Sequence, residues 1–166
     1  IYGGQRFYER MEIRNALAYL RLLLNRGDDA AMERVVNTPP RGIGGKTLDT
    51  LRELARARDL SLWQAMAVAR DEKLLSSRAL GALEGFRVLI DELDSGADAL
   101  TLEELTDTVI RGAGLIDLYR REKGEKGQAR VENLEELVTA ARQFSPVGEE
   151  LSPLQQFLDN AALDAG

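Results

Sequence analysis

One short stretch of the sequence places glycine, lysine and threonine in the order that phosphate-binding loops use: TPPRGIGGKTLDTL, residues 38–51. A Walker A nucleotide loop needs a glycine five positions before the glycine that precedes its lysine, and it must follow a buried strand. Pro40 occupies that position, and the preceding AAMERVVNT is typical of a charged helix. Because both requirements fail, the stretch predicts no nucleotide loop.

The composition removes most catalytic chemistry. The 166 residues include no His and no Cys, so the usual base of Ser-His and Cys-His catalysis, the usual zinc ligands and disulfides are all missing. No apolar run approaches the length of a membrane-spanning helix. The absence of Cys fits a reducing compartment. We expect a cytoplasmic chain of ordinary domain size, with no catalytic residue and no metal site.

The net charge of -6 conceals a segregated pattern. Residues 1–26, 39–58 and 120–130 each carry a net charge of +3, whereas residues 71–104 and 131–166 each carry -6. Such segregation suits a surface with one side facing a polyanion, although a basic run is also common on an ordinary solvated face.

Apolar residues recur with helical spacing almost throughout the chain. Their stripes predict helices over about residues 9–25, from about residue 46, and around residues 83–93 and 131–141. Only the initial IYGG has an extended pattern. We therefore expect an all-α fold, an irregular array of about eight or nine short-to-medium helices. Further helix starts are predicted at Asp28, Ser61, Thr101 and Ser152.

The glycine stretch is expected to connect two of these helices. A short helix ending at Asn37 is stopped by Pro39 and Pro40, because the residue before a proline is pushed out of the helical region. A second helix begins near Lys46. The result is a tight hairpin between two helices.

The turn of this hairpin resembles a helix-hairpin-helix element, in which a Gly-hydrophobic-Gly turn binds a DNA backbone phosphate without reading bases. Gly42 and Gly44 permit positive φ and the close approach of a partner. Ile43, between them, is expected to turn inward and fix the turn against the two helices.

The helix start after the turn supplies the binding chemistry. Backbone amides from Gly45 to Thr47 lack partners within the helix and carry partial positive charge. Arg41 and Lys46 add formal charge beside them. The expected ligand is a duplex backbone, because the segment offers no aromatic platform for stacking single strands. A turn in which the glycines serve steric needs alone stays open as the alternative.

Two other features are expected to be structural. The GEKG segment, residues 124–127, has the spacing of a KH-domain loop, but a KH domain needs a sheet that this sequence lacks, so a simple loop is predicted. Trp63 shares an apolar helical face with Leu62 and Met66, so it is expected in the core rather than on a stacking platform.

Three stretches together resemble one family: YGGQRFYERMEIRNALAYLRLLLN at residues 2–25, MERVVNTPPRGIGGKTLD at residues 32–49, and EKGEKGQARVENLEELVTAARQF at residues 122–144. In this order they resemble subdomain 2B of the UvrD, Rep and PcrA group of superfamily 1A DNA helicases, with the UvrD branch nearest. The resemblance spans essentially the whole chain. The sequence departs from the pattern at Asn15, where the family usually has Asp, and at Gly45, where an acidic or polar residue is common.

The resemblance implies that residues 1–166 are a single helical subdomain inserted into a motor, with residues 1–5 as a strand stub from the motor subdomain. Motors of this family hold ATP and Mg between two RecA-like subdomains and move 3′ to 5′ on single-stranded DNA. Their ATPase motifs are expected to lie outside this segment, so the chain itself is expected to bind no cofactor and hydrolyse no ATP. A bacterial, nucleoid-associated protein of DNA repair or replication is implied.

The resemblance also implies the residues that contact duplex DNA at a junction with single-stranded DNA: Gly42, Ile43, Gly44 and Thr47, with Arg41 and Lys46 as basic supports, and Lys123, Lys126 and Arg130 as further candidates chosen from charge. The family uses this subdomain as a swivelling regulator and as a docking surface. An alternative function is therefore a protein-docking or autoinhibitory module. Its acidic segments, residues 71–104 or 131–166, would then contact other helicase subdomains or repair and transcription partners.

Overall fold

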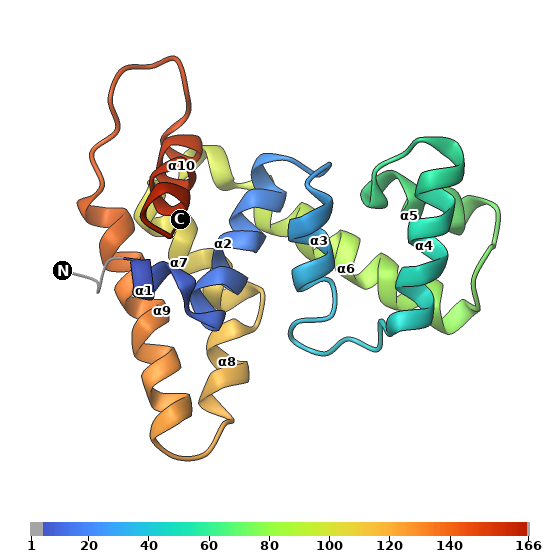
Figure 1. The fold of residues 1–166 in the computed structure, drawn as a ribbon, viewed down its shortest axis with the longest axis horizontal. Helices are drawn as coiled ribbons and strands as arrows, with labels where there is room; N and C mark the ends of the chain where they lie inside the picture. The colour runs from blue at the N-terminus through green and yellow to red at the C-terminus, as the bar shows by residue number, and fades with distance from the viewer. Residues whose placement is uncertain (1–4, 166) are drawn as a thin grey trace.

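The computed structural model describes residues 5–165, and all regular structure in that range is helical (Figure 1). The predicted all-α class is confirmed. Ten α-helices and one 3-10 helix occur among these residues, slightly more than the eight or nine expected. The predicted strand stub lies outside the described residues except for Gln5, where the prediction is wrong because Gln5 begins a helix.

The helices are short to medium in length. The first six are α1 (Gln5–Glu9), α2 (Met11–Leu24), α3 (Asp29–Val35), α4 (Gly45–Arg58), α5 (Leu62–Asp71) and α6 (Ser77–Ser95). The remaining elements are the 3-10 helix η1 (Ala97–Ala99), α7 (Leu102–Gly112), α8 (Leu115–Arg120), α9 (Glu125–Gln143) and α10 (Pro153–Ala165). Over residues 5–165, no helix has the length and apolar character that crossing a membrane requires.

Side-chain caps explain where several helices begin. The four predicted starts are confirmed, because a side-chain oxygen accepts a backbone N–H of the first turn at Asp28, Ser61, Thr101 and Ser152. Ser61 and Thr101 also form complete capping boxes with Gln64 and Glu104. A cap depends on residues within four positions of each other, so it can be recognised in the sequence.

Two predicted boundaries are wrong, both beside glycine turns. The helix before the glycine hairpin ends at Val35 rather than Asn37. The GEKG segment is a loop only at Gly124, because Glu125 already begins α9. Gly127 lies in the first turn of α9, where a Cβ atom would clash with the carbonyl oxygens of Glu122 and Tyr119. Glycine there permits the close approach of α8 and α9.

Helix α2 lies at the centre of the array and packs against α1, α3, α6, α7, α9 and α10. Figure 1 shows an elongated molecule with α4 and α5 at one end and α9 at the other. The long α6 runs between the two ends, packing against α5 near its start and against α2 and α7 further along. The connection from α3 to α4 lies between these two ends.

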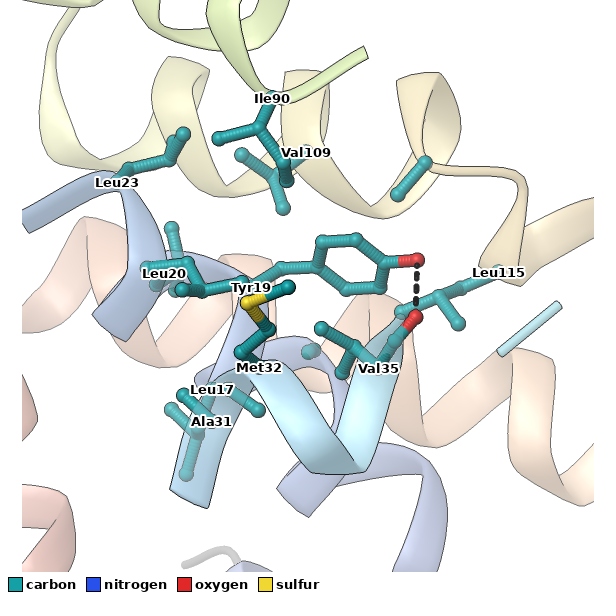
Figure 2. Packing of buried hydrophobic residues seen from close by; sticks show 14 of the residues in the cluster. Leu17, Tyr19, Leu20, Leu23, Ala31, Met32, Val35, Ile90, Val109 and Leu115 are labelled. Carbon is teal, nitrogen blue, oxygen red and sulfur yellow. Dashed lines mark hydrogen bonds between the residues drawn. The ribbon is translucent and has the colours of Figure 1, made fainter. Parts of the chain in front are cut away.

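Tyr19 of α2 marks the centre of the core. Its side chain is fully buried, and Figure 2 shows its ring between Ile90 and Val109 on one side and Met32 and Val35 on the other. These residues come from α2, α3, α6 and α7, so four helices meet around one aromatic ring. The glycine hairpin is joined to this centre by a hydrogen bond from Arg41 to the Tyr19 hydroxyl.

Trp63 lies against the core at the α5 end, as expected. Its two predicted companions, Leu62 and Met66, are buried. The half-buried Trp63 ring makes an edge contact with Phe86 at 6.3 Å between ring centres and lies under the guanidinium of Arg26 at 5.3 Å. The Trp63 ring therefore packs against other parts of the protein, as expected for a core residue rather than a stacking platform.

Candidate nucleic-acid interface

The connection between α3 and α4, residues 36–44, is organised around the side chain of Asn37. Its Oδ1 atom accepts hydrogen bonds from the backbone N–H of Arg41, at 2.6 Å, and of Ile43, at 3.2 Å. Sequence reasoning treated Asn37 only as a helix end. The signal that could have identified it is an Asn directly ahead of a turn, since Asn side chains often bond to nearby backbone groups.

The glycine turn uses positive φ at Gly42 and not at Gly44, the other glycine expected to permit it. Gly42 has φ +80°, a conformation that favours glycine, although a Cβ atom there would meet nothing within 4 Å. Ile43 turns inward and is 1% exposed, which confirms its predicted role in fixing the turn. The requirement at Gly42 is therefore conformational rather than steric.

Gly44 and Gly45 differ from Gly42, because nothing in the described chain requires glycine there. Gly44 has φ -90° and ψ -176°, a conformation open to any residue, and Gly45 is helical. A Cβ atom at either position would meet nothing within 4 Å. The missing side chains leave backbone open to a partner from outside.

Helix α4 begins without a side-chain cap. Its N-cap residue is Gly44, and the first bond of the helix runs from the N–H of Leu48 to the carbonyl of Gly44, at 3.2 Å. Within residues 5–165, the N–H groups of Gly45, Lys46 and Thr47 find no acceptor. Three amide donors at a positive helix end can together bind an anion such as a phosphate.

Arg41 lies on the inner side of the loop, so it supports the loop from within. Its Nη1 atom donates to the carbonyl oxygens of Val35, Val36 and Thr38, at 2.8, 3.1 and 3.2 Å. These carbonyls lie at the end of α3 and just after it, where the helix no longer supplies donors, although the Val35 carbonyl also accepts the N–H of Thr38 at 3.0 Å. The other amino group, Nη2, donates to the hydroxyl of Tyr19 at 2.5 Å. All of these acceptors lie inside the protein, so the guanidinium is turned away from any ligand of the turn.

Arg41 also joins the loop to two further helices. Its Nη2 atom donates to the carbonyl of Ala113 at the end of α7, at 3.4 Å. Its guanidinium lies 5.3 Å from the ring centre of Phe86 in α6. The loop is therefore fixed to α2, α6 and α7 through one side chain.

Lys46, in the first turn of α4, carries the positive charge that lies beside the glycine turn and is exposed to solvent. Among the other basic side chains of residues 39–58, Arg52 pairs with Glu33 and Asp49, and Arg58 pairs with Glu72 at 2.5 Å. Arg56 is exposed but lies near the other end of α4, away from the turn. Lys46 is exposed and forms no ion pair with the described residues. The positive potential at the turn thus comes from Lys46 and the open amides.

The second group of candidates is Lys123, Lys126 and Arg130, on the α8–α9 turn. This turn lies apart from the α3–α4 connection, residues 36–44, which we call the glycine loop (Figure 1). Lys123 and Lys126 are exposed there. Arg130 is half-buried, pairs with Glu122 at 2.5 Å and lies 5.8 Å from the ring centre of Tyr119. The structure therefore leaves the two lysines accessible and holds Arg130 against the protein.

Asn15, where the sequence departs from the family pattern, joins two helices at a buried position. Its Oδ1 atom accepts from Nε of Arg34 at 2.9 Å, and its Nδ2 atom donates to the hydroxyl of Tyr119 at 2.8 Å. Asparagine provides both an acceptor and a donor, whereas an aspartate could only accept. Burial raises the pKa of Tyr119, and the bond from Asn15 opposes that shift.

Comparison with known proteins identifies the class. The chain belongs to the family of UvrD-like helicase C-terminal domains, which matches residues 1–166. It is 58% identical to DNA helicase II of Escherichia coli K12, over 100% of this chain and 23% of that protein. It is 36% identical to the ATP-dependent DNA helicase PcrA of Bacillus subtilis 168, over 99% of this chain and 22% of that protein. The chain thus spans less than a quarter of the length of these relatives.

Proposed function

We propose that residues 1–166 form the 2B subdomain of a bacterial 3′–5′ DNA helicase of repair or replication, and that it contacts duplex DNA beside a single-strand junction. The contact is to the sugar-phosphate backbone and is independent of sequence. ATP and Mg bind to motor subdomains beyond this chain, and the whole protein acts at the nucleoid. The family membership and the helicase relatives support this assignment.

The observation that carries the proposal is the open start of α4. Gly44 and Gly45 leave the backbone accessible, three N–H groups lack acceptors within the described chain, and Lys46 stands exposed beside them. Such a site binds a phosphate oxygen by amide hydrogen bonds and charge. It reads no base edge, which suits a helicase that must act on any sequence.

Fluorescence anisotropy with a labelled, single-strand-tailed duplex tests the proposal. With two or three phosphate contacts, log affinity should fall against log salt with a slope of roughly -2 to -3. The variant Lys46→Glu should weaken duplex binding strongly, because it replaces the exposed cation with an anion beside the open amides. Binding to the single strand alone should be weaker than to the tailed duplex.

The matched control is Lys73→Glu, which changes charge equally at an exposed site between α5 and α6. It should leave duplex binding near the wild-type level. Circular dichroism should show both variants folded. Equal affinities for Lys46→Glu and the wild type would remove the glycine loop from the interface, and salt-independent binding would reject backbone recognition.

A protein-docking or autoinhibitory role is the second candidate. It is favoured by exposed apolar side chains beside acidic ones: Val147 and Leu151 are 84% and 51% exposed, next to Glu149 and Glu150. The acidic segment at residues 71–104 supports it less, because many of its carboxylates pair with the protein's own arginines. Docking predicts that a Val147→Ser, Leu151→Ser variant loses binding to other helicase subdomains and keeps its duplex affinity.

A further inference from the structure

A groove of about 380 Å³ lies between α2, α3 and α10, away from the glycine turn. Three arginines line it: Arg14 and Arg21 from α2, and Arg34 from α3. The acidic lining among the described residues is Asp28, whose Oδ1 atom caps α3 by accepting the N–H of Ala31 at 3.0 Å. The groove is therefore basic overall.

The arginines of this groove lack acidic partners. Arg14 and Arg21 form no ion pair with the residues that the structure describes. Arg34 donates its Nε–H to Asn15, which is neutral. Burial and the nearby charge of Arg14 both lower the pKa of Arg34. Like charges thus face each other across the groove, an arrangement that an anion would relieve.

Most of the apolar lining of the groove is alanine, with Leu17 as a larger buried side chain. Ala18, Ala31 and Ala161 line it and are buried, and Tyr8 beside them is 5% exposed. Specific protein partners usually place large apolar or aromatic anchors into matching pockets. The large apolar side chains of this lining, Leu17 and Tyr8, are themselves buried, and the accessible large side chains of the groove are the arginines, so we expect recognition here to depend on charge.

The spacing of the arginines favours a chain of anions over a single ion. Arg14 and Arg21 are seven residues apart on one face of α2, which places their backbones about 10 Å apart along the helix. A single phosphate bridges such a distance poorly, whereas successive backbone phosphates can reach both side chains. Arginine suits this ligand, because its guanidinium binds phosphate oxygens in a bidentate manner.

We propose that this groove is a second site for the phosphate backbone of nucleic acid, with Arg14, Arg21 and Arg34 as its ligands. The inference rests on the proposed function and adds a contact surface to it. The short helix α3 connects the two sites: Arg34 lies in the groove and the glycine loop begins two residues later, after Val35. One nucleic-acid ligand that reaches both sites would contact the protein on either side of α3.

The test is anisotropy with the tailed duplex over a salt series, using the double variant Arg14→Gln, Arg21→Gln. Neither side chain makes an ion pair within the described chain, so the fold should be kept. The slope of log affinity against log salt should become shallower by about 2, since each arginine that no longer binds a phosphate removes about one unit. The control Lys73→Gln, Arg78→Gln removes the same charge at exposed sites and should leave the slope unchanged. A slope equal to that of the wild type in the groove variant overturns the inference.

Amide NMR shifts of Ala31 and Ala161 identify the ligand class. The tailed duplex should shift both signals in the wild type and neither in the groove variant. Inorganic phosphate that saturates the same shifts at matched ionic strength would overturn the proposal in favour of a single-anion site. Poly-L-glutamate that shifts them when the duplex does not would overturn it in favour of an acidic protein.

The same measurements separate this inference from the proposed function. Loss of affinity in Lys46→Glu alone supports the glycine loop and rejects the groove. Loss in the groove variant alone supports the groove and rejects the loop. The triple variant combines Lys46→Glu with Arg14→Gln and Arg21→Gln. Losses of affinity in both separate variants, with a larger loss in the triple variant, support two contacts on one ligand.

Discussion

The guanidinium of Arg41 donates a hydrogen bond of 2.5 Å to the hydroxyl of Tyr19, and this contact ties the glycine loop to the centre of the core. Tyr19 is fully buried, and its hydroxyl in turn donates to the carbonyl of Val35 at 3.3 Å (Figure 2). The proposed duplex contact therefore stands on a rigid base. A binding loop gains affinity when its backbone is ordered before the ligand arrives.

Replacing Arg41 by lysine should destabilise the protein. A lysine keeps the charge but cannot reach the carbonyls of Val35, Val36 and Thr38 and the Tyr19 hydroxyl together. The free energy of unfolding in urea should fall by roughly 2–3 kcal/mol, the scale of removing hydrogen bonds to a charged group. Arg78→Lys, at an exposed site, should stay within about 0.5 kcal/mol of the wild type. Unchanged stability in Arg41→Lys would contradict the internal role.

Two alanine substitutions should separate folding from binding at the turn. Gly42→Ala forces a residue with a side chain to φ +80° and should cost about 1–2 kcal/mol of stability. Gly44→Ala has space and an ordinary conformation, so its stability should change by less than about 0.5 kcal/mol. It should nevertheless weaken duplex binding, because the added methyl group lies where the phosphate approaches. Urea unfolding and anisotropy measure the two effects. Wild-type duplex affinity in Gly44→Ala would show that no partner comes close to this backbone.

The buried tyrosines should make the protein lose stability in alkali. Burial raises the pKa of Tyr19 above that of an exposed tyrosine, while the charge of Arg41 opposes the shift. The contribution is complete below the ordinary tyrosine pKa of about 10 and is lost as pH rises through the higher folded value. Unfolding free energies measured in urea from pH 8 upward should therefore fall above about pH 10. The decline should be shallower in Tyr19→Phe, and an equal decline would assign it to other groups.

The α8–α9 turn should not tolerate a side chain at Gly127. A Cβ atom there would clash with the carbonyl oxygen of Glu122, so Gly127→Ala should cost more than about 2 kcal/mol through overpacking against backbone. Gly81→Ala is the matched control, because Gly81 lies exposed in α6 with nothing near its missing Cβ. It should stabilise the protein by roughly 0.5–1 kcal/mol. A mild effect at Gly127 would mean that α8 and α9 can separate without cost.

The elements that could be predicted from the sequence are those set by nearby residues. The cap at Thr101 and the inward position of Ile43 both follow from local pattern, and both are confirmed. The direction of Arg41 could not be predicted, because its acceptors include Ala113, 72 residues away. The start of α9 at Glu125 could not be predicted either, because the glycines at 124 and 127 are both turn signals in the sequence, while Gly127 is needed inside the helix for its close approach to the carbonyls of Glu122 and Tyr119. The DNA-contacting roles stay predictions for all nine candidates, of which Ile43 is buried and Arg41 bonds inward: Arg41, Gly42, Ile43, Gly44, Lys46, Thr47, Lys123, Lys126 and Arg130.

The contact between Arg41 and Ala113 also has an evolutionary consequence. The turn after α7 adjoins the glycine loop a second time at Gly114, where a Cβ atom would lie 3.3 Å from Cγ of Pro39. Sequence changes in this turn are therefore constrained by a loop that lies far away in the chain. Among related proteins, residues 39–41 and 113–114 should vary together, and an insertion in one of these turns should be accompanied by a change in the other.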